Sequence, residues 1–299
     1  MTNRTRSRAL LAAAGLATVA ATTVEAQGAR RDARAVRRLR DSVTTVLARG
    51  LAEGAYPGAV AIVGSRRGPL ATVAVGRLDP RDSTAPTPAT RWDLASLTKV
   101  IATTTLVMQL VDEGRVQLDT PVVRYLPSWR GERAEGITVR HLLTHASGLP
   151  AWRAFYKEAD DAAEARAQLL LVAPEAPPGR RMVYSDIGFL LLGRLVEELT
   201  GLPLDSAFAV RVARPLALQA TGFRPPWEAR PGVAPTEFDA WRQRQVHGEV
   251  HDENAYRFGG VAGHAGLFAS ASDLSRLAQA LLAGGRLGRV RLVSTRTLR

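Results

Sequence analysis

The chain contains no cysteine in its 299 residues, so no disulfide, thiol nucleophile or cysteine-ligated zinc contributes to its fold or chemistry. Hydrophobic residues make up 46% of the sequence and charged residues 23%, which is ordinary for a globular protein. A chain of this length can bury a large core, as one big domain or as two ordinary ones. We therefore expect the fold to depend on the packing of apolar side chains.

The first 26 residues have the pattern of an export signal. Three arginines between residues 4 and 8 form a basic start, a weakly apolar run follows over residues 9–24, and Ala26 ends a small-x-small cleavage site. The run is too short and too weakly apolar to predict a stable membrane span after signal cleavage, and an uncleaved anchor is the alternative. We expect a periplasmic or secreted protein that starts near residue 27.

The chain is basic, with a formal net charge of +12. A basic surface favours anionic partners such as cell envelopes or nucleic acid. The arginines are scattered, however, and the densest run, at residues 30–40, also fits the solvated face of an amphipathic helix. We therefore expect no nucleic-acid partner.

Apolar periodicity predicts a helix, a strand hairpin and then a mainly helical region. A stripe of apolar residues from Val36 to Leu51 predicts a helix that lies on a core. Two β-like segments at residues 59–64 and 70–76 predict the hairpin. Helical periodicity then recurs at residues 100–111, 162–171, 187–199 and 273–282. Because the final residues show no helix-ending signal, we expect the sequence to be cut short at residue 299.

Lysine is rare in this chain, because 38 of its 40 basic residues are arginine and only Lys99 and Lys157 are lysine. Ser96 precedes Lys99 by three residues, a spacing that places both on one face of a helix. A serine nucleophile needs a base within hydrogen-bond reach, and an amine can lose its proton where a guanidinium cannot. The pair therefore predicts a nucleophile and its base. The alternative is that Ser96 caps the following helix and Lys99 is solvated.

A second candidate is Tyr184, which lies just before the helix predicted from residue 187. A phenol near an ammonium can pass protons to a leaving group. On its own, however, such a tyrosine is more often a packed aromatic residue with a satisfied hydroxyl.

Four segments in order resemble the serine β-lactamase and penicillin-binding-protein superfamily: SLTK at 96–99, HLLTHASGL at 141–149, PPGRRMVYSDIGFLLLG at 177–193 and GGVAGHAGLFASASDLSRLAQALL at 259–282. They are similar to its class C-like branch, which also holds D-alanyl-D-alanine carboxypeptidases and esterases, over about residues 34–299. The resemblance implies an α and β, two-domain fold: an antiparallel sheet flanked by helices plus an inserted mainly helical domain. The implied parts are a signal peptide at 1–26, the N-terminal part of the α/β domain at 27–95, the helical domain at 96–258 and an incomplete return to the α/β domain at 259–299, with C-terminal strands missing.

The same resemblance implies catalysis by Ser96 as nucleophile, Lys99 as base and Tyr184 as proton shuttle, through an acyl-enzyme that water hydrolyses, with no cofactor. The substrate is expected to be a small molecule or peptide, with β-lactams, D-Ala-D-Ala peptides and short esters all open, and peptidoglycan is a candidate partner. The alternative is a non-catalytic relative that binds cell-envelope peptides.

Two features depart from the family pattern. Its second motif is usually Tyr-x-Asn, whereas here the third position is Asp186, whose carboxylate would stabilise protonated Lys99 and oppose its role as base. Its third motif is a Lys-x-Gly or His-x-Gly on a strand, and the only match is His264-Ala-Gly266, within the GVAGHAGLF segment. We keep Asp186, His264 and Gly266 as candidate substrate-binding residues and expect the true third motif beyond residue 299.

The remaining histidines suggest a metal site only weakly. His247 and His251 have i, i+4 spacing and acidic neighbours, but Gly248 weakens the helix that such a site needs. We therefore expect no metal. We expect His141 and His145 to be structural residues that fix a loop through hydrogen bonds.

Overall fold

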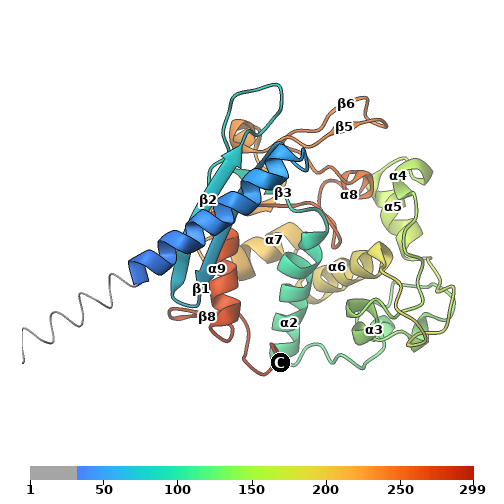
Figure 1. Ribbon diagram of the computed structural model, residues 1–299. Coiled ribbons are helices and arrows are strands. Elements are labelled where there is room, and N and C mark those ends of the chain that lie inside the picture. The colour runs from blue at the N-terminus through green and yellow to red at the C-terminus, as the bar shows by residue number, and fades with distance from the viewer. Residues whose placement is uncertain (1–31) are drawn as a thin grey trace, which may run out of the picture.

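A computed structural model describes residues 32–299, and the predicted export signal lies outside these residues (Figure 1). Residues 32–52 form a helix, as predicted. The prediction that its apolar stripe lies on a core is met in part: Leu39, Val43, Leu47 and Leu51 are half-buried, whereas Val36 and Val46 are 36% and 67% exposed. The helix is anchored near its C-terminal end, where the Tyr56 hydroxyl donates a hydrogen bond to the Leu47 carbonyl at 2.9 Å.

The predicted hairpin is confirmed as strands β1 (Gly58–Ser65) and β2 (Gly68–Gly76), which pair antiparallel. Helix α9 (Ala271–Leu282), which the sequence also predicted, lies against β1 (Figure 1), and its buried residues include Leu277 and Ala280. The hairpin near the beginning of the described chain and helix α9 near its end therefore pack together.

A second antiparallel sheet has the order β3-β7-β4, from Arg91–Asp93, Leu267–Ser270 and Gly222–Phe223. All four residues of β7 are buried, and the Leu94 N–H donates to the Leu267 carbonyl at 2.9 Å. This sheet places the segment before Ser96 beside the segment that follows His264. The other strands of residues 32–299 form two antiparallel ribbons of two-residue strands: β5 (Phe238–Asp239) with β6 (Arg244–Gln245), and β8 (Arg286–Leu287) with β9 (Val290–Arg291).

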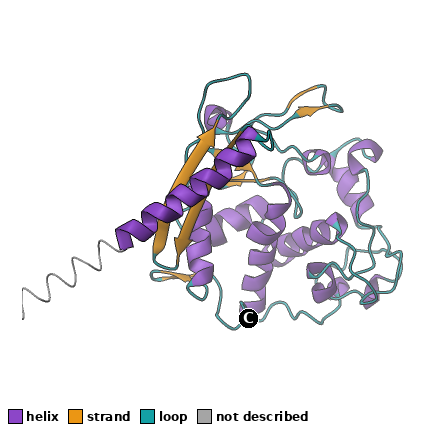
Figure 2. Cartoon of the chain, viewed as in Figure 1, coloured by secondary structure: helices purple, strands orange, loops and turns teal. Residues whose placement is uncertain are grey.

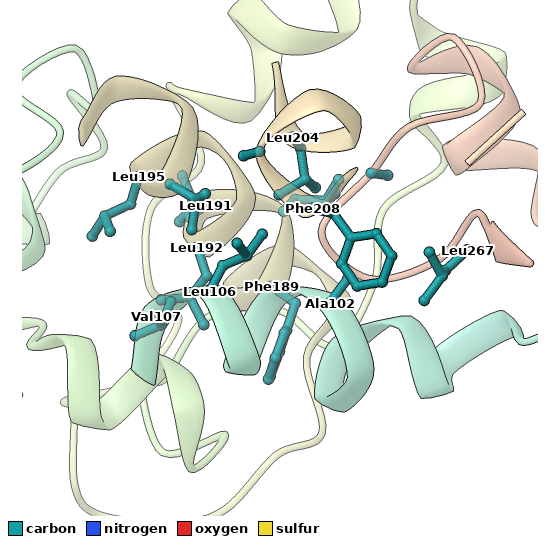
Figure 3. Packing of buried hydrophobic residues seen from close by; sticks show 14 of the residues in the cluster. Ala102, Leu106, Val107, Phe189, Leu191, Leu192, Leu195, Leu204, Phe208 and Leu267 are labelled. Atoms are coloured by element: carbon teal, nitrogen blue, oxygen red, sulfur yellow. The ribbon is translucent and has the colours of Figure 1, made fainter. Parts of the chain in front are cut away.

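Helices fill the other side of the molecule, away from the long strands (Figure 2). The central one is α6 (Asp186–Thr200), which buries nine of its 15 residues and packs its leucines against α2 (Thr105–Asp112), with Phe208 nearby (Figure 3). The shorter helices are α3 (Val139–Leu143), α4 (Phe155–Glu158), α5 (Ala162–Leu169), α7 (Leu204–Phe208) and α8 (Glu253–Arg257). Further short elements are the 3-10 helices η3 (Val122–Arg124), η4 (Ala134–Gly136) and η6 (Trp227–Gly232) and the π-helix η5 (Ala209–Ala213). The implied domain boundaries at residues 95 and 258 stay predictions.

The helix that carries Ser96 differs from the regular α-helix that the spacing predicts. A 3-10 turn, η1 (Ala95–Leu97), is followed by a π-helical stretch, η2 (Lys99–Thr104), and only then by α2. Ala95 has φ +45°, a left-handed conformation that residues with a Cβ rarely adopt. The chain therefore leaves β3 through a constrained turn directly before Ser96, and short π-helical stretches of this kind are frequent at functional sites.

Candidate active site

Ser96 and Lys99 are in direct contact. The Lys99 Nζ donates a hydrogen bond to the Ser96 Oγ at 2.9 Å. Ser96 is exposed, whereas the Lys99 side chain is only 3% exposed. The Ser96 side chain caps no helix here, and Lys99 is not solvated, so the alternative interpretation of this pair is wrong.

The Lys99 Nζ contacts three oxygen atoms. It donates hydrogen bonds to the Ser96 Oγ and to the His264 carbonyl at 3.3 Å, and it forms an ion pair with the Asp186 Oδ1 at 2.7 Å. The Tyr184 ring centroid lies 4.7 Å from the Nζ, within the range of a cation–π interaction. The predicted pairing of Asp186 with Lys99 is thus present in the geometry.

The start of α6 places Tyr184 and Asp186 beside the lysine. The Ser185 hydroxyl caps α6 by accepting from the Gly188 N–H at 3.2 Å, and it donates to the Pro150 carbonyl at 2.6 Å. The Asp186 N–H donates to the Ala151 carbonyl at 2.9 Å. Tyr184 is 51% exposed, so its ring contacts the buried amine from the solvent side.

His145 contacts this machinery, a contact that the sequence analysis missed. Its Nδ1 accepts a hydrogen bond from the Ser185 N–H at 3.0 Å, and its ring lies 4.4 Å from the Tyr184 ring. Burial, together with the positive charge of Lys99, lowers the pKa of His145. A neutral imidazole suits an Nδ1 that accepts a hydrogen bond. His141 instead caps α3, where its Nδ1 accepts from the Thr138 N–H at 3.2 Å.

His264 and Gly266 lie behind Lys99. The His264 ring is 1% exposed, and its Nε2 lies 2.9 Å from the Asp252 Oδ1, so the prediction that this side chain binds substrate is wrong. What His264 presents to the site is its backbone carbonyl. Gly266 has φ +110°, and a Cβ there would lie 2.7 Å from the Gly260 carbonyl oxygen, so this position requires glycine. The segment therefore serves as a scaffold for the base.

Two aspartates near the site, Asp93 and Asp252, were not predicted to belong to it. Asp93 accepts N–H groups on both oxygens, from Ala95 at 2.8 Å and from His251 at 2.7 Å, and burial raises the pKa of its carboxyl. For Asp252, burial alone would raise the pKa, but the charge and hydrogen bond of His264 outweigh it and lower the pKa to about 2.

His247 and His251 do not converge on one point. The His247 Nε2 lies 2.8 Å from the Val233 carbonyl oxygen, and the His251 Nε2 lies 3.2 Å from the Glu237 Oε1. In residues 32–299, no group of three or more histidine, aspartate or glutamate side chains is arranged to hold a metal ion. The same residues include no helix that is long and apolar enough to span a membrane.

The family model of the β-lactamases matches residues 43–299. The chain belongs to the β-lactamase family. A protein from Salmonella schwarzengrund (strain CVM19633), provisionally described as a D-alanyl-D-alanine carboxypeptidase, is 33% identical over 236 residues, which are 70% of this chain and 55% of that protein. A Salmonella typhi protein with the same description is 32% identical over the same shares. The chain thus spans about half the length of the curated relatives it matches.

Solved structures show the same fold. EstCE1, described as a hydrolase with promiscuous acyltransferase activity, has a TM-score of 0.71 at 22% identity, covering 88% of this chain and 76% of that one. A penicillin-binding-protein homologue from Caulobacter crescentus has a TM-score of 0.71 at 22% identity, covering 86% and 73%. The expected superfamily and its mixed α and β fold are confirmed.

Proposed function

We propose that this protein is an exported serine hydrolase that cleaves an ester or amide through an acyl-enzyme on Ser96. The observation that carries the proposal is the 2.9 Å contact between an exposed serine hydroxyl and a buried lysine amine. A serine becomes a useful nucleophile when a base lies within hydrogen-bond reach. Export rests on the pattern of residues 1–26 and is tested by the N-terminal sequence of the protein recovered outside the cytoplasm.

Proton transfer in this proposal involves Asp186 and Tyr184 in different steps. Lys99 can accept the Ser96 proton only as a neutral amine, so its ammonium must first give a proton to a neighbouring base. The Asp186 carboxylate, 2.7 Å from the Nζ, is the neighbour that can take it. The half-exposed Tyr184 hydroxyl then gives its proton to the leaving group and regains one from the Lys99 ammonium, and water hydrolyses the acyl-enzyme. The backbone N–H of Ser96 is the expected first donor to the oxyanion.

The substrate is an activated or peptide carbonyl of the kinds that related proteins take: a β-lactam, a D-Ala-D-Ala peptide or a short ester. The description of the Salmonella proteins supports the peptide, and that of EstCE1 supports a broader hydrolase. A second candidate is a non-catalytic protein that binds cell-envelope peptides. The Asp186–Lys99 ion pair favours this candidate because a carboxylate beside the amine opposes its role as a base.

Covalent labelling tests the proposal. The protein is treated with a fluorophosphonate or a reporter penicillin, and the adduct is mapped by mass spectrometry. We expect one adduct on Ser96 that disappears in Ser96→Ala and persists in Ser83→Ala, a matched control at another exposed serine. An adduct on another serine, or labelling that survives Ser96→Ala, contradicts the assignment. A folded protein that takes no label and hydrolyses no ester supports the binding protein instead.

A further inference from the structure

We propose that residues 250–252 form a positioning unit, held by the buried Asp239–Arg242 ion pair, that places both Ser96 and Lys99. The proposal rests on the proposed serine hydrolase function. No hydrogen bond or ion pair joins residues 250–252 directly to Ser96 or Lys99. Residues 250–252 act through Asp93 on the side of the nucleophile and through His264 on the side of the base.

The first connection runs from residue 251 to the nucleophile. The His251 N–H donates to one oxygen of Asp93 at 2.7 Å, and the Ala95 N–H donates to the other at 2.8 Å. One carboxylate therefore bridges residue 251 and the left-handed Ala95 that directly precedes Ser96. Because residues with a Cβ rarely adopt this conformation, surrounding contacts have to maintain it. The hydrogen bond from the Ala95 N–H to Asp93 is one such contact.

The second connection runs from residue 252 to the base. The Asp252 Oδ1 lies 2.9 Å from the His264 Nε2, and the same oxygen accepts from the Ala255 N–H at 2.7 Å as the cap of α8. The His264 ring is almost fully buried, so this contact fixes the residue whose carbonyl accepts from the Lys99 Nζ. Residue 251 is thus connected to Ser96 through Asp93, and its neighbour, residue 252, is connected to Lys99 through His264.

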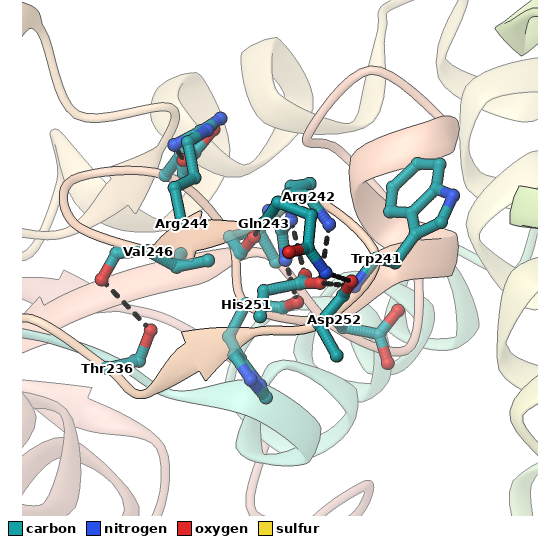
Figure 4. Close-up of polar contacts among 12 residues, drawn as sticks. Thr236, Trp241, Arg242, Gln243, Arg244, Val246, His251 and Asp252 are labelled. Carbon is teal, nitrogen blue, oxygen red and sulfur yellow. Dashed lines mark hydrogen bonds and ion pairs between the residues drawn. The ribbon is translucent and has the colours of Figure 1, made fainter.

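The β5–β6 hairpin holds this segment in place (Figure 4). The Arg242 Nε pairs with the Asp239 Oδ2 at 2.5 Å, and the two side chains are only 5% and 2% exposed. The guanidinium also donates to the Val250 carbonyl at 2.8 Å and to the His251 carbonyl. A planar guanidinium with several fixed donors can orient two adjacent carbonyls at once, which a lysine ammonium cannot do in the same geometry.

A buried ion pair is weak evidence for stability, because desolvation of its charges offsets much of their attraction. Its better attested use is to specify one arrangement among several. The same hairpin carries a second pair, Arg244 with Glu249, which is 46% and 24% exposed and makes no hydrogen bond to the carbonyls of residues 250 and 251. A substitution in this pair is the matched control, because it perturbs the hairpin without removing a hydrogen bond to residues 250 and 251.

The experiment compares Asp93→Asn, Asp252→Asn and Arg242→Lys with the control Arg244→Lys. In Asp93→Asn, the side-chain oxygen can accept only one of the two N–H groups that Asp93 accepts on its two oxygens. In Arg242→Lys, the positive charge remains, but the planar guanidinium with its fixed donors is lost. We expect the three test variants to melt cooperatively, to react with a fluorophosphonate about 10- to 100-fold more slowly at Ser96, and to lose kcat with little change in KM. Arg244→Lys is expected to match the wild type. The proposal is overturned if folded test variants are labelled at the wild-type rate. It is also overturned if the labelling rate falls only in proportion to the fraction of protein that is unfolded.

A spectroscopic measurement separates this proposal from the proposed function. The chain has two lysines, so protein labelled with ¹³C at lysine Cε gives one signal for Lys99 and one for Lys157. We expect Asp252→Asn and Arg242→Lys to move the Lys99 signal and Arg244→Lys to leave it in place. If wild-type protein takes no label at Ser96, the proposed function fails, and the Lys99 signal still decides whether residues 250–252 position the amine. An unmoved Lys99 signal in folded Asp252→Asn overturns the proposal even if Arg242→Lys does not fold.

Discussion

Replacing Lys99 by methionine or by arginine separates the charge of this residue from its capacity to exchange a proton. Methionine fills the space of the stem and removes the amine, whereas arginine keeps a permanent charge. In the native site, the Nζ lies 2.7 Å from the Asp186 Oδ1, with side chains that are 3% and 19% exposed. Lys99→Met therefore leaves a mostly buried carboxylate without its counter-ion.

The magnitude follows from this geometry. At 2.7 Å and an effective dielectric constant of about 20, the attraction is about 6 kcal/mol. The desolvation of both charges offsets part of it, and removing one partner of a buried pair costs about 3–5 kcal/mol. Because Asp186 is one-fifth exposed, we expect a loss near the lower end, about 3 kcal/mol, in the free energy of unfolding. Adding Asp186→Asn to Lys99→Met should recover much of this loss, which urea unfolding of the four proteins in the cycle measures.

Activity should respond differently from stability. Both Lys99→Arg and Lys99→Met should lower the rate of Ser96 labelling and of ester hydrolysis about 10²–10⁴-fold, the usual effect of removing a general base. That loss corresponds to about 3–5 kcal/mol in the barrier. Near-wild-type turnover in Lys99→Arg would refute the reasoning, because it would mean that the site needs a fixed charge and no proton transfer. A double variant no more stable than Lys99→Met would refute the assigned ion-pair energy.

Three further predictions concern residues around this site. Because folding lowers the pKa of His145, the stability of the protein should fall as the pH drops below about 6.5. His145→Asn keeps a hydrogen-bond acceptor and tolerates the left-handed backbone, so thermal melts of this variant should depend less on pH. Asp252, with a pKa of about 2 against an ordinary 3.8, should contribute about 2 kcal/mol above about pH 4 that is lost as the pH falls through about 2. Urea unfolding between these pH values should show no such loss in Asp252→Asn. Gly263→Ala, whose Cβ would lie 2.0 Å from a backbone oxygen of α6, should lose about 1–3 kcal/mol, whereas Gly222→Ala, with open space, should stay within about 0.5 kcal/mol in the same assay.

The parts of the site that sequence could predict depend on local spacing or on charge type. Ser96 and Lys99 are three residues apart, so any helical turn brings them together, and the observed contact needs no regular α-helix. The pairing of Asp186 with Lys99 follows from opposite charges once both reach the site. The hairpin of β1 and β2 follows from its two short apolar runs and the turn between them.

The remaining features depend on contacts between distant segments. The left-handed Ala95 and the irregular turns after it depend on Asp93, which is itself bridged to a residue 158 positions later. The His264 side chain was predicted to bind substrate because its motif matches the family, but its burial against Asp252 is a tertiary contact that no spacing shows. The stripe from Val36 to Leu51 predicts a helix correctly, yet periodicity cannot say which surface covers an apolar face.

The unequal exposure of the two lysines determines how the protein should react with amine-selective reagents. Lys157 is exposed on α4, whereas Lys99 is 2% exposed and in contact with three oxygen atoms. Apart from the chain's own α-amino group, acylating reagents should therefore modify Lys157 selectively, which permits attachment of a dye or a solid support at one defined place without loss of Ser96 labelling. Modification of Lys99 would then report that the site has opened, and peptide mapping of the native protein against the urea-unfolded protein measures this directly.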